Sequence, residues 1–160
     1  MYVNLCKIAL HENWCDNWKT EVIKVPKLRT YITYKTYFAK EPYLDIVKNR
    51  GQRALLSQLR TGVLPLSIET GRFSNIPLEY RLCLLCNEDN VEDECHFLFR
   101  CTLYSDLRST FINCFSPNVN HFHSLSDAEK LKLVMKSDNI KHTALFIYKA
   151  FSKRRQTLYS

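Results

Sequence analysis

Four residues with the spacing of a metal site constrain this chain more than any other feature. Cys83 and Cys86 enclose two leucines, His96 follows after nine intervening residues, and Cys101 follows after four more. A C-x2-C turn lets two thiolates converge on one ion, and a more distant His/Cys pair can complete a tetrahedron. Three thiolates and one imidazole suit zinc best and iron second. Because the protein would fill all four positions, the pattern predicts a structural zinc site and no open catalytic position.

The second half of this motif needs a particular backbone path. On an unbroken α-helix, His96 and Cys101 would lie about 140° apart around the axis. We therefore expect a short helix through His96 to end near Arg100, so that Cys101 turns back to the ion. The acidic run at 92–94 suits a helix N-terminus, and one of its carboxylates could orient the imidazole. Two alternatives stay open: Cys95 competes with His96, or the four residues are buried without metal.

The remaining cysteines do not suggest a disulfide framework. The chain has seven cysteines, an odd number, and four are taken by the predicted metal site. Its first ten residues lack the cationic start and long apolar stretch of a secretory signal. A reducing compartment, cytoplasm or nucleus, is therefore expected, where disulfides are rare. Cys6, Cys15 and Cys114 have no partner motif and are expected to pack.

The fold class expected is mostly α. Only three glycines and five prolines occur in 160 residues, which disfavours a many-turned β-sandwich. Helices are expected at 52–60, 104–115 and 140–156. A further helix is expected to follow a capping box at Ser126–Glu129, and another to run from Pro42 to a break at Gly51. The segment 27–39 fits either a strand or a helix, and helix is favoured. Short strands are expected at 66–69 and 72–73, which leaves one short β-hairpin open.

Three regions are predicted along the chain. Residues 1–26 form an N-terminal helical extension, in which Trp14 and Trp18 share one face that docks on the rest. Residues 27–115 form the zinc-binding domain, with an embedded CCHC zinc knuckle at 80–104. Residues 116–160 form a helical pair that packs on that domain. A basic cluster at 153–155 suits the negative end of the last helix dipole.

The charge of the chain favours an anionic partner. The net charge is +7, and nucleic acid is the commonest partner of such a chain, although a merely basic surface explains the charge as well. No apolar window is long enough for a transmembrane helix, and no membrane or small-molecule substrate is expected. The arginines expected to contact phosphate are Arg50, Arg53, Arg60, Arg72 and Arg81. Tyr31 and Tyr34 are candidate stacking partners for bases, or else core residues.

A series of short motifs runs in order through the middle of the chain. They are Lys27–Tyr31, Glu41–Leu44, Gln58–Gly62, Leu64–Leu66, Ile68–Phe73, Cys83-x2-Cys86, Val91–Glu94, His96–Cys101 and Leu103–Tyr104. Together they resemble the C-terminal, zinc-binding region of reverse transcriptases from non-LTR retrotransposons of animals, over about residues 24–115. The resemblance is looser in the last helices and barely present in residues 1–23.

The resemblance implies a segment that lies downstream of a polymerase domain and helps to hold element RNA or target DNA. The zinc ligands it implies are Cys83, Cys86, His96 and Cys101. The chain departs from the family at Thr102, where a proline is frequent, and at Cys95, where a polar residue is usual. The polymerase domain of a parent element is an implied partner.

Catalytic motifs of the parent enzymes are missing from this sequence. It has no adjacent Asp-Asp pair, which a polymerase palm needs, and no Pro-Asp pair after the knuckle, as some element endonucleases show. The chain is therefore expected to be a non-enzymatic, stand-alone fragment that binds zinc and nucleic acid. The alternatives are a zinc-stabilised protein-interaction scaffold and a remnant without function.

Overall fold

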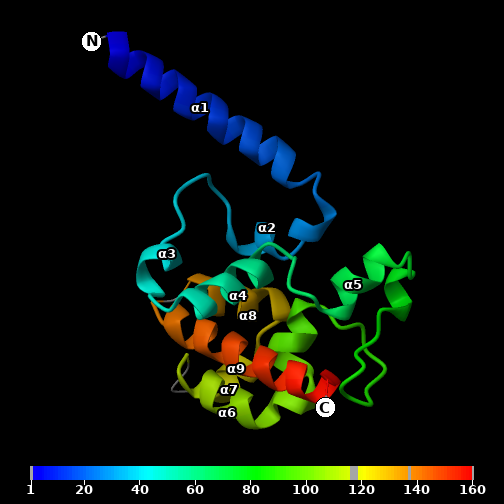
Figure 1. The fold of residues 1–160 in the computed structure, drawn as a ribbon. Coiled ribbons are helices and arrows are strands. Elements are labelled where there is room, and N and C mark those ends of the chain that lie inside the picture. Colours follow the sequence, from blue (N-terminus) through cyan, green and yellow to red (C-terminus); the bar gives the residue numbers. More distant parts are fainter. Residues whose placement is uncertain (1, 116–118, 137, 160) are drawn as a thin grey trace.

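The computed structural model describes residues 2–115, 119–136 and 138–159, and it is helical, which confirms the predicted class (Figure 1). Its α-helices are α1 (Tyr2–Val22), α2 (Tyr31–Tyr34), α3 (Tyr43–Ile46), α4 (Arg50–Arg60), α5 (Ser67–Phe73), α6 (Ser105–Asn113), α7 (Val119–Ser124), α8 (Asp127–Lys136) and α9 (Ile140–Tyr159). Short 3-10 turns lie at Pro26–Leu28 (η1), Leu78–Tyr80 (η2) and Thr102–Tyr104 (η4), and a π-helical turn lies at His96–Arg100 (η3).

The last helix, α9, is the centre of the core. It packs on α4, α6 and α8, and α8 in turn packs on α2. Its apolar stripe is buried as predicted at Ala144, Ile147 and Phe151, whereas Tyr148 is 41% exposed. Phe146 of α9 stacks on Phe111 of α6 at 4.4 Å between ring centroids. The described part of 116–160 thus adds a third short helix, α7, to the predicted pair, and all three belong to the common core.

Of the two glycines expected to interrupt helices, only one does so. The break expected at Gly51 is wrong, because α4 begins at Arg50 and runs through Gly51. The side chain of Asn49 caps this helix by accepting a hydrogen bond from the backbone N–H of Gln52 at 3.0 Å. The stop expected at Gly62 is confirmed, since Gly62 has φ +66°, and an added Cβ would lie 2.0 Å from the carbonyl oxygen of Lys27.

The strands expected at 66–69 and 72–73 are wrong, because residues 67–73 form helix α5. The carbonyl oxygen of Leu66 accepts hydrogen bonds from the backbone N–H groups of Glu69 and Thr70, which closes the first turn. Tertiary burial of Ile68 and Glu69 on one face then overrides the weak strand propensity. In the described ranges, the only β pairing is an antiparallel bridge between Leu82 and Val91, which opens the knuckle.

The N-terminal segment projects from the body. Helix α1 extends away from the other helices in Figure 1, and Trp14 on it is 62% exposed. Both predicted tryptophans still contact the rest of the chain: Trp14 and Trp18 each lie 6.4 Å from the ring of Phe38, and Trp18 lies 6.4 Å from that of Tyr31. The favoured helix at 27–39 shortens to η1 and α2. Across the described residues, no helix combines the length and apolarity needed to span a membrane.

Candidate metal centre

The four predicted ligands come together at one point. Cys83 and Cys86 lie in the loop that the Leu82–Val91 bridge closes, whereas His96 begins η3 and Cys101 directly follows it. Their ligand atoms all lie within 4.8 Å of one another. Cys83 Sγ is 3.9 Å from Cys101 Sγ, and Cys86 Sγ is 3.3 Å from His96 Nε2. A tetrahedral zinc with bonds of about 2.3 Å to sulfur has edges of about 3.8 Å, so the cluster has the size of a metal site.

A π-helical turn joins the last two ligands. The expected helix does end at Arg100, and Cys101 then adopts an extended conformation with φ −49° and ψ 122°. The backbone N–H of Cys101 donates to the carbonyl oxygen of His96 at 2.8 Å, a bond between residues five apart. This wider turn brings His96 and Cys101 onto the same side, which an α-helix would not do. Turns of this kind are frequent at functional sites.

Arg108 of α6 holds the end of this turn. Its buried guanidinium donates to the carbonyl oxygens of Leu98 at 2.9 Å, Cys101 at 2.7 Å and Arg100 at 3.4 Å. Carbonyls at a helix end lack intrahelical partners, and of these three that of Cys101 also accepts from the backbone N–H of Tyr104 at 3.2 Å. Burial lowers the pKa of Arg108. This role could not be predicted from the sequence, because a basic residue in the first turns of a helix is usually solvated.

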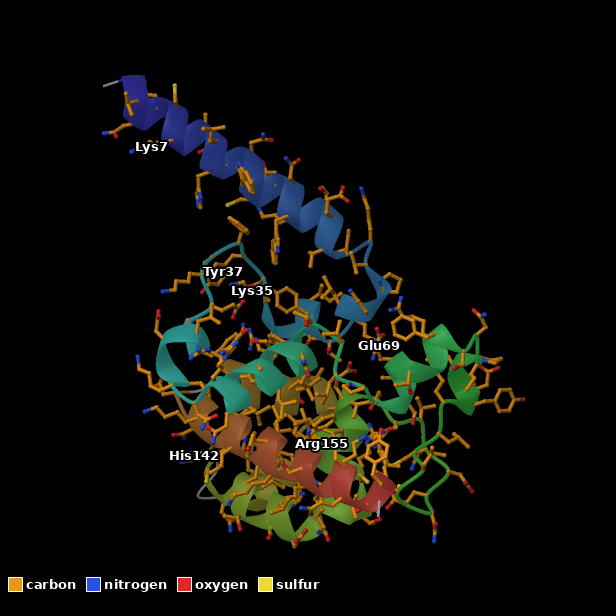
Figure 2. All side chains as sticks on the ribbon, viewed as in Figure 1. Lys7, Lys35, Tyr37, Glu69, His142 and Arg155 are labelled. Atoms are coloured by element: carbon orange, nitrogen blue, oxygen red, sulfur yellow. The ribbon has the colours of Figure 1, made fainter. Side chains whose placement is uncertain are left out.

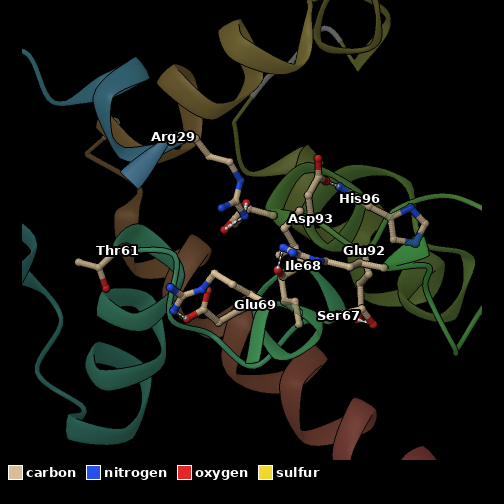
Figure 3. A network of polar contacts seen from close by, with 12 residues as sticks. Arg29, Thr61, Ser67, Ile68, Glu69, Glu92, Asp93 and His96 are labelled. Atoms are coloured by element: carbon tan, nitrogen blue, oxygen red, sulfur yellow. Dashed lines mark hydrogen bonds and ion pairs between the residues drawn. The ribbon is translucent and has the colours of Figure 1, made fainter. Parts of the chain in front are cut away.

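The acidic run before His96 organises the backbone and does not hold the imidazole. Asp93 Oδ1 accepts from the backbone N–H of His96 at 2.7 Å, while Glu94 pairs with Arg29 at 2.8 Å (Figure 3). Burial raises the pKa of Glu94. The expectation that a carboxylate orients the ring is therefore wrong, since His96 Nδ1 is buried without a hydrogen-bond partner.

Glu92 is the most enclosed carboxylate next to the cluster. It accepts from the backbone N–H and the hydroxyl of Ser67 at 2.7 and 2.8 Å, and it forms an ion pair with Arg154 of α9. Cys83 Sγ lies 3.9 Å from Glu92 Oε1, the same oxygen that pairs with Arg154. Arg154 is 5% exposed, so it does not act as the solvated helix-end cation that the sequence suggested.

Burial and hydrogen bonds between the thiols of the cluster shift their pKa values. The hydrogen bond to Cys101 and then burial raise the pKa of Cys83 to about 12, and burial raises the pKa of Cys86. The same hydrogen bond from Cys83 lowers the pKa of Cys101. Three thiols at this spacing ionise together only beside a cation, because its positive charge compensates for the solvation that the thiolates lose on burial. The donor set fits a metal ion.

The other cysteines lie outside the cluster. Cys95 is half-buried, and burial raises its pKa to about 12. The group whose ligand atoms come together contains His96 and not Cys95. Cys114 donates to the carbonyl oxygen of Thr110, and Cys15 contacts His11, as packing residues do. Cys6 is exposed, so the expectation that it packs is wrong. All seven cysteines, each a described residue, are free of disulfides.

Two residues expected at a nucleic-acid surface lie in the core. Arg60 is 4% exposed and pairs with Glu41 at 2.5 Å, so it is removed as a phosphate contact. Tyr34 is buried, and its hydroxyl donates to the carbonyl oxygen of Arg60. Tyr31 is half-buried beside Trp18.

The other four arginines keep some exposed surface. Arg50 is exposed, whereas Arg53 is half-buried and donates to the carbonyl oxygen of Val47. Arg81 donates to the carbonyl oxygen of Ile68 at 2.9 Å. Arg72 pairs with Glu69 at 2.7 Å and keeps 48% of its side chain exposed.

Exposed apolar side chains lie just before the knuckle and in its first residues, and the sequence analysis did not predict them. Phe73 at the end of α5 is 74% exposed, Tyr80 in η2 is 67% exposed, and Leu84 within the first ligand pair is 78% exposed. The guanidinium of Arg72 lies 4.8 Å from the centre of the Phe73 ring. The available signal was the adjacency of arginine and aromatic residues in Arg72-Phe73 and Tyr80-Arg81, an interleaving typical of single-strand binding.

Comparisons with protein-family models, curated proteins and solved structures give no match to this chain. The metal-type cluster and the exposed residues around it are therefore the basis for a functional assignment.

Proposed function

We propose that this chain is a zinc-binding, nucleic-acid-binding module related to the C-terminal region of non-LTR retrotransposon reverse transcriptases, with no catalysis of its own. The observation that carries the proposal is the cluster of Cys83, Cys86, His96 and Cys101, whose atom spacings match the edges of a zinc tetrahedron. Zinc would be held by four protein ligands and would stabilise residues 80–104. With no position left for water, its role is structural.

The surface beside the knuckle supports nucleic acid as the partner. Phe73 and Tyr80 are exposed aromatic side chains, and Arg72 and Arg81 lie next to them in the chain. Bases of a single strand stack on such rings, while guanidinium groups contact the phosphates. The net charge of +7 favours the same class of partner. We name Arg72, Phe73, Tyr80 and Arg81 the knuckle-side surface.

A protein-interaction scaffold is the second candidate, and one observation favours it. Leu84, at the tip of the first ligand pair, is 78% exposed, and Leu78 in η2 is 56% exposed. Exposed leucines beside aromatic rings also suit a protein partner. In that case the zinc site would serve only to fix the shape of the knuckle.

Binding titrations at two salt concentrations separate these candidates. Purified zinc-loaded protein is titrated with single-stranded RNA and with duplex DNA at low and at physiological salt. The proposal expects binding that weakens steeply with salt, because phosphate contacts release counterions. Undetectable binding of both nucleic acids at low salt would overturn it and leave the scaffold.

A further inference from the structure

A second polar centre lies away from the knuckle. A cavity of about 300 Å³ opens beside α2 and α3, and α3 lies on the opposite side of the molecule from α5 in Figure 1. Small-ligand pockets begin at about this volume. The lining residues used below include Tyr34, Lys35, Tyr37, Glu41, Tyr43 and Arg60.

The cavity holds two cations that share one carboxylate. Glu41 pairs with Lys35 Nζ at 2.9 Å through one oxygen and with Arg60 at 2.5 Å through the other. Lys35 is 8% exposed and Arg60 is 4% exposed. Lys136 and Asp138 also line the cavity and offset each other, so its five charged side chains sum to one net positive charge. An uncompensated buried charge is costly, so this centre favours an incoming anion.

Arg60 is held in the wall of the cavity by aromatic rings. Its guanidinium lies 4.6 Å from the ring centre of Tyr34 and 4.8 Å from that of Tyr43. One nitrogen donates to the carbonyl oxygen of Met135 at 3.3 Å, while its buried Nε has no hydrogen-bond partner. A buried donor without an acceptor is rare in folded proteins, so Arg60 leaves part of its positive charge without a hydrogen-bonded partner beside the cavity.

The rim of the cavity offers an aromatic face. Tyr37 is 62% exposed, and Lys35 Nζ lies 5.0 Å from the centre of its ring. Figure 2 shows Lys35 and Tyr37 next to each other on the loop that follows α2. A ligand whose phosphate meets Lys35 could lay a flat ring against Tyr37.

We propose that this cavity binds a nucleotide, with its phosphate at Lys35, near the buried positive charge of Arg60, and its base against Tyr37. The same chemistry is presented by a free mononucleotide and by the phosphorylated end of a strand. The inference does not require the knuckle-side surface to bind nucleic acid, because it uses a separate set of residues.

Calorimetric titration of the full chain tests the proposal with matched probes. The probes are adenosine monophosphate, adenosine, an RNA oligonucleotide with a terminal phosphate, and the same oligonucleotide without it. We expect the phosphorylated member of at least one pair to bind at least tenfold more tightly than its partner. Binding of the mononucleotide identifies a free ligand, and binding of the phosphorylated strand alone identifies a strand end. Equal binding within both pairs, or no binding, would overturn the proposal.

Variants locate the site. Lys35→Gln should weaken binding of the phosphorylated probe at least tenfold, and Tyr37→Ala should weaken it severalfold. Tyr37→Ala keeps the buried pair of Arg60 and Glu41, so it tests the site even if Lys35→Gln lowers stability. Lys132→Gln, an exposed lysine of α8, is the charge-matched control and should bind as the parent does. Parent-like binding by both Lys35→Gln and Tyr37→Ala would sink the assignment.

Discussion

Arg154 of α9 forms a buried ion pair with Glu92, which precedes the third metal ligand by four residues. The two residues are 62 positions apart, and both are almost fully excluded from solvent. Glu92 also accepts two hydrogen bonds from Ser67, so the pair joins the last helix, the start of α5 and the knuckle. The metal-type cluster is therefore anchored to the helical core through its acidic flank.

Breaking this pair should destabilise the fold. Arg154→Met leaves Glu92 buried without its cation, and we expect the free energy of unfolding to fall by about 3–5 kcal/mol. Chemical denaturation measures the change. Lys153→Gln is the neighbouring control, since Lys153 pairs with Asp106 at the surface and should cost below about 1 kcal/mol. Similar losses in the two variants would contradict the buried role of Arg154.

Metal analysis should find one zinc per chain. Cys86→Ser removes one ligand, so it should lose the metal and disorder residues 80–104 first, because zinc contributes on the order of 10 kcal/mol to such sites. Elemental analysis and hydrogen exchange measure the two effects. Cys95→Ser, next to the third ligand but outside the cluster, should keep full metal content. Unchanged melting of the parent protein with a chelator would argue against the site.

Arg108→Ala should loosen the end of the π-helical turn. The substitution leaves the carbonyl oxygen of Leu98 buried without a donor and that of Cys101 with only the backbone N–H of Tyr104, so the free energy of unfolding should fall by roughly 1–3 kcal/mol. Zinc release to a colorimetric chelator should also be faster, because Cys101 loses its backbone support. A variant with parent stability and an unchanged release rate would show that Arg108 does not hold the turn.

Aromatic residues of the knuckle-side surface should carry part of the affinity for single strands. Phe73→Ala and Tyr80→Ala should each weaken RNA binding about tenfold, because a stacked base contributes about 1–3 kcal/mol. Fluorescence anisotropy measures the affinity. Tyr159→Ala removes an equally exposed aromatic ring, 85% exposed, at the end of α9 and should have no effect. An equal loss in Tyr159→Ala would remove the special role of this surface.

Alkaline pH should destabilise the protein through Tyr31. Burial, and then the negative charge of Glu41, raise the pKa of Tyr31 from its ordinary value of 10.0 to about 12. The folded state therefore holds this proton more tightly than the unfolded state. Its contribution to stability is complete below pH 10 and is lost as the pH rises through about 12. Tyr31→Phe should flatten the fall of unfolding free energy over this range, and identical slopes would refute the assignment.

The sequence predicted what depends on local pattern. Ligand spacing gave the four cluster residues, the Ser126–Glu129 capping box forms as expected, and the apolar stripe gave α9. What failed depends on partners distant in sequence. Burial of Ile68 turned an apparent strand into α5, and Glu41 drew Arg60 into the core. The carbonyl-binding role of Arg108 depends on a π-helical turn that no residue pattern announces.

The π-helical turn makes the two longer gaps of the motif, between the second and third ligands and between the third and fourth, unequal in their tolerance of length change. The gap between the second and third ligands crosses residues 87–90, which are exposed, so inserted residues can bulge into solvent. The gap between the third and fourth ligands is a hydrogen-bonded ring from His96 to Cys101. Deleting one residue there would shorten that ring to an α-helical one and rotate the final sulfur out of register. The length of the gap between Cys86 and His96 is thus free to vary, whereas backbone geometry fixes the length of the gap between His96 and Cys101.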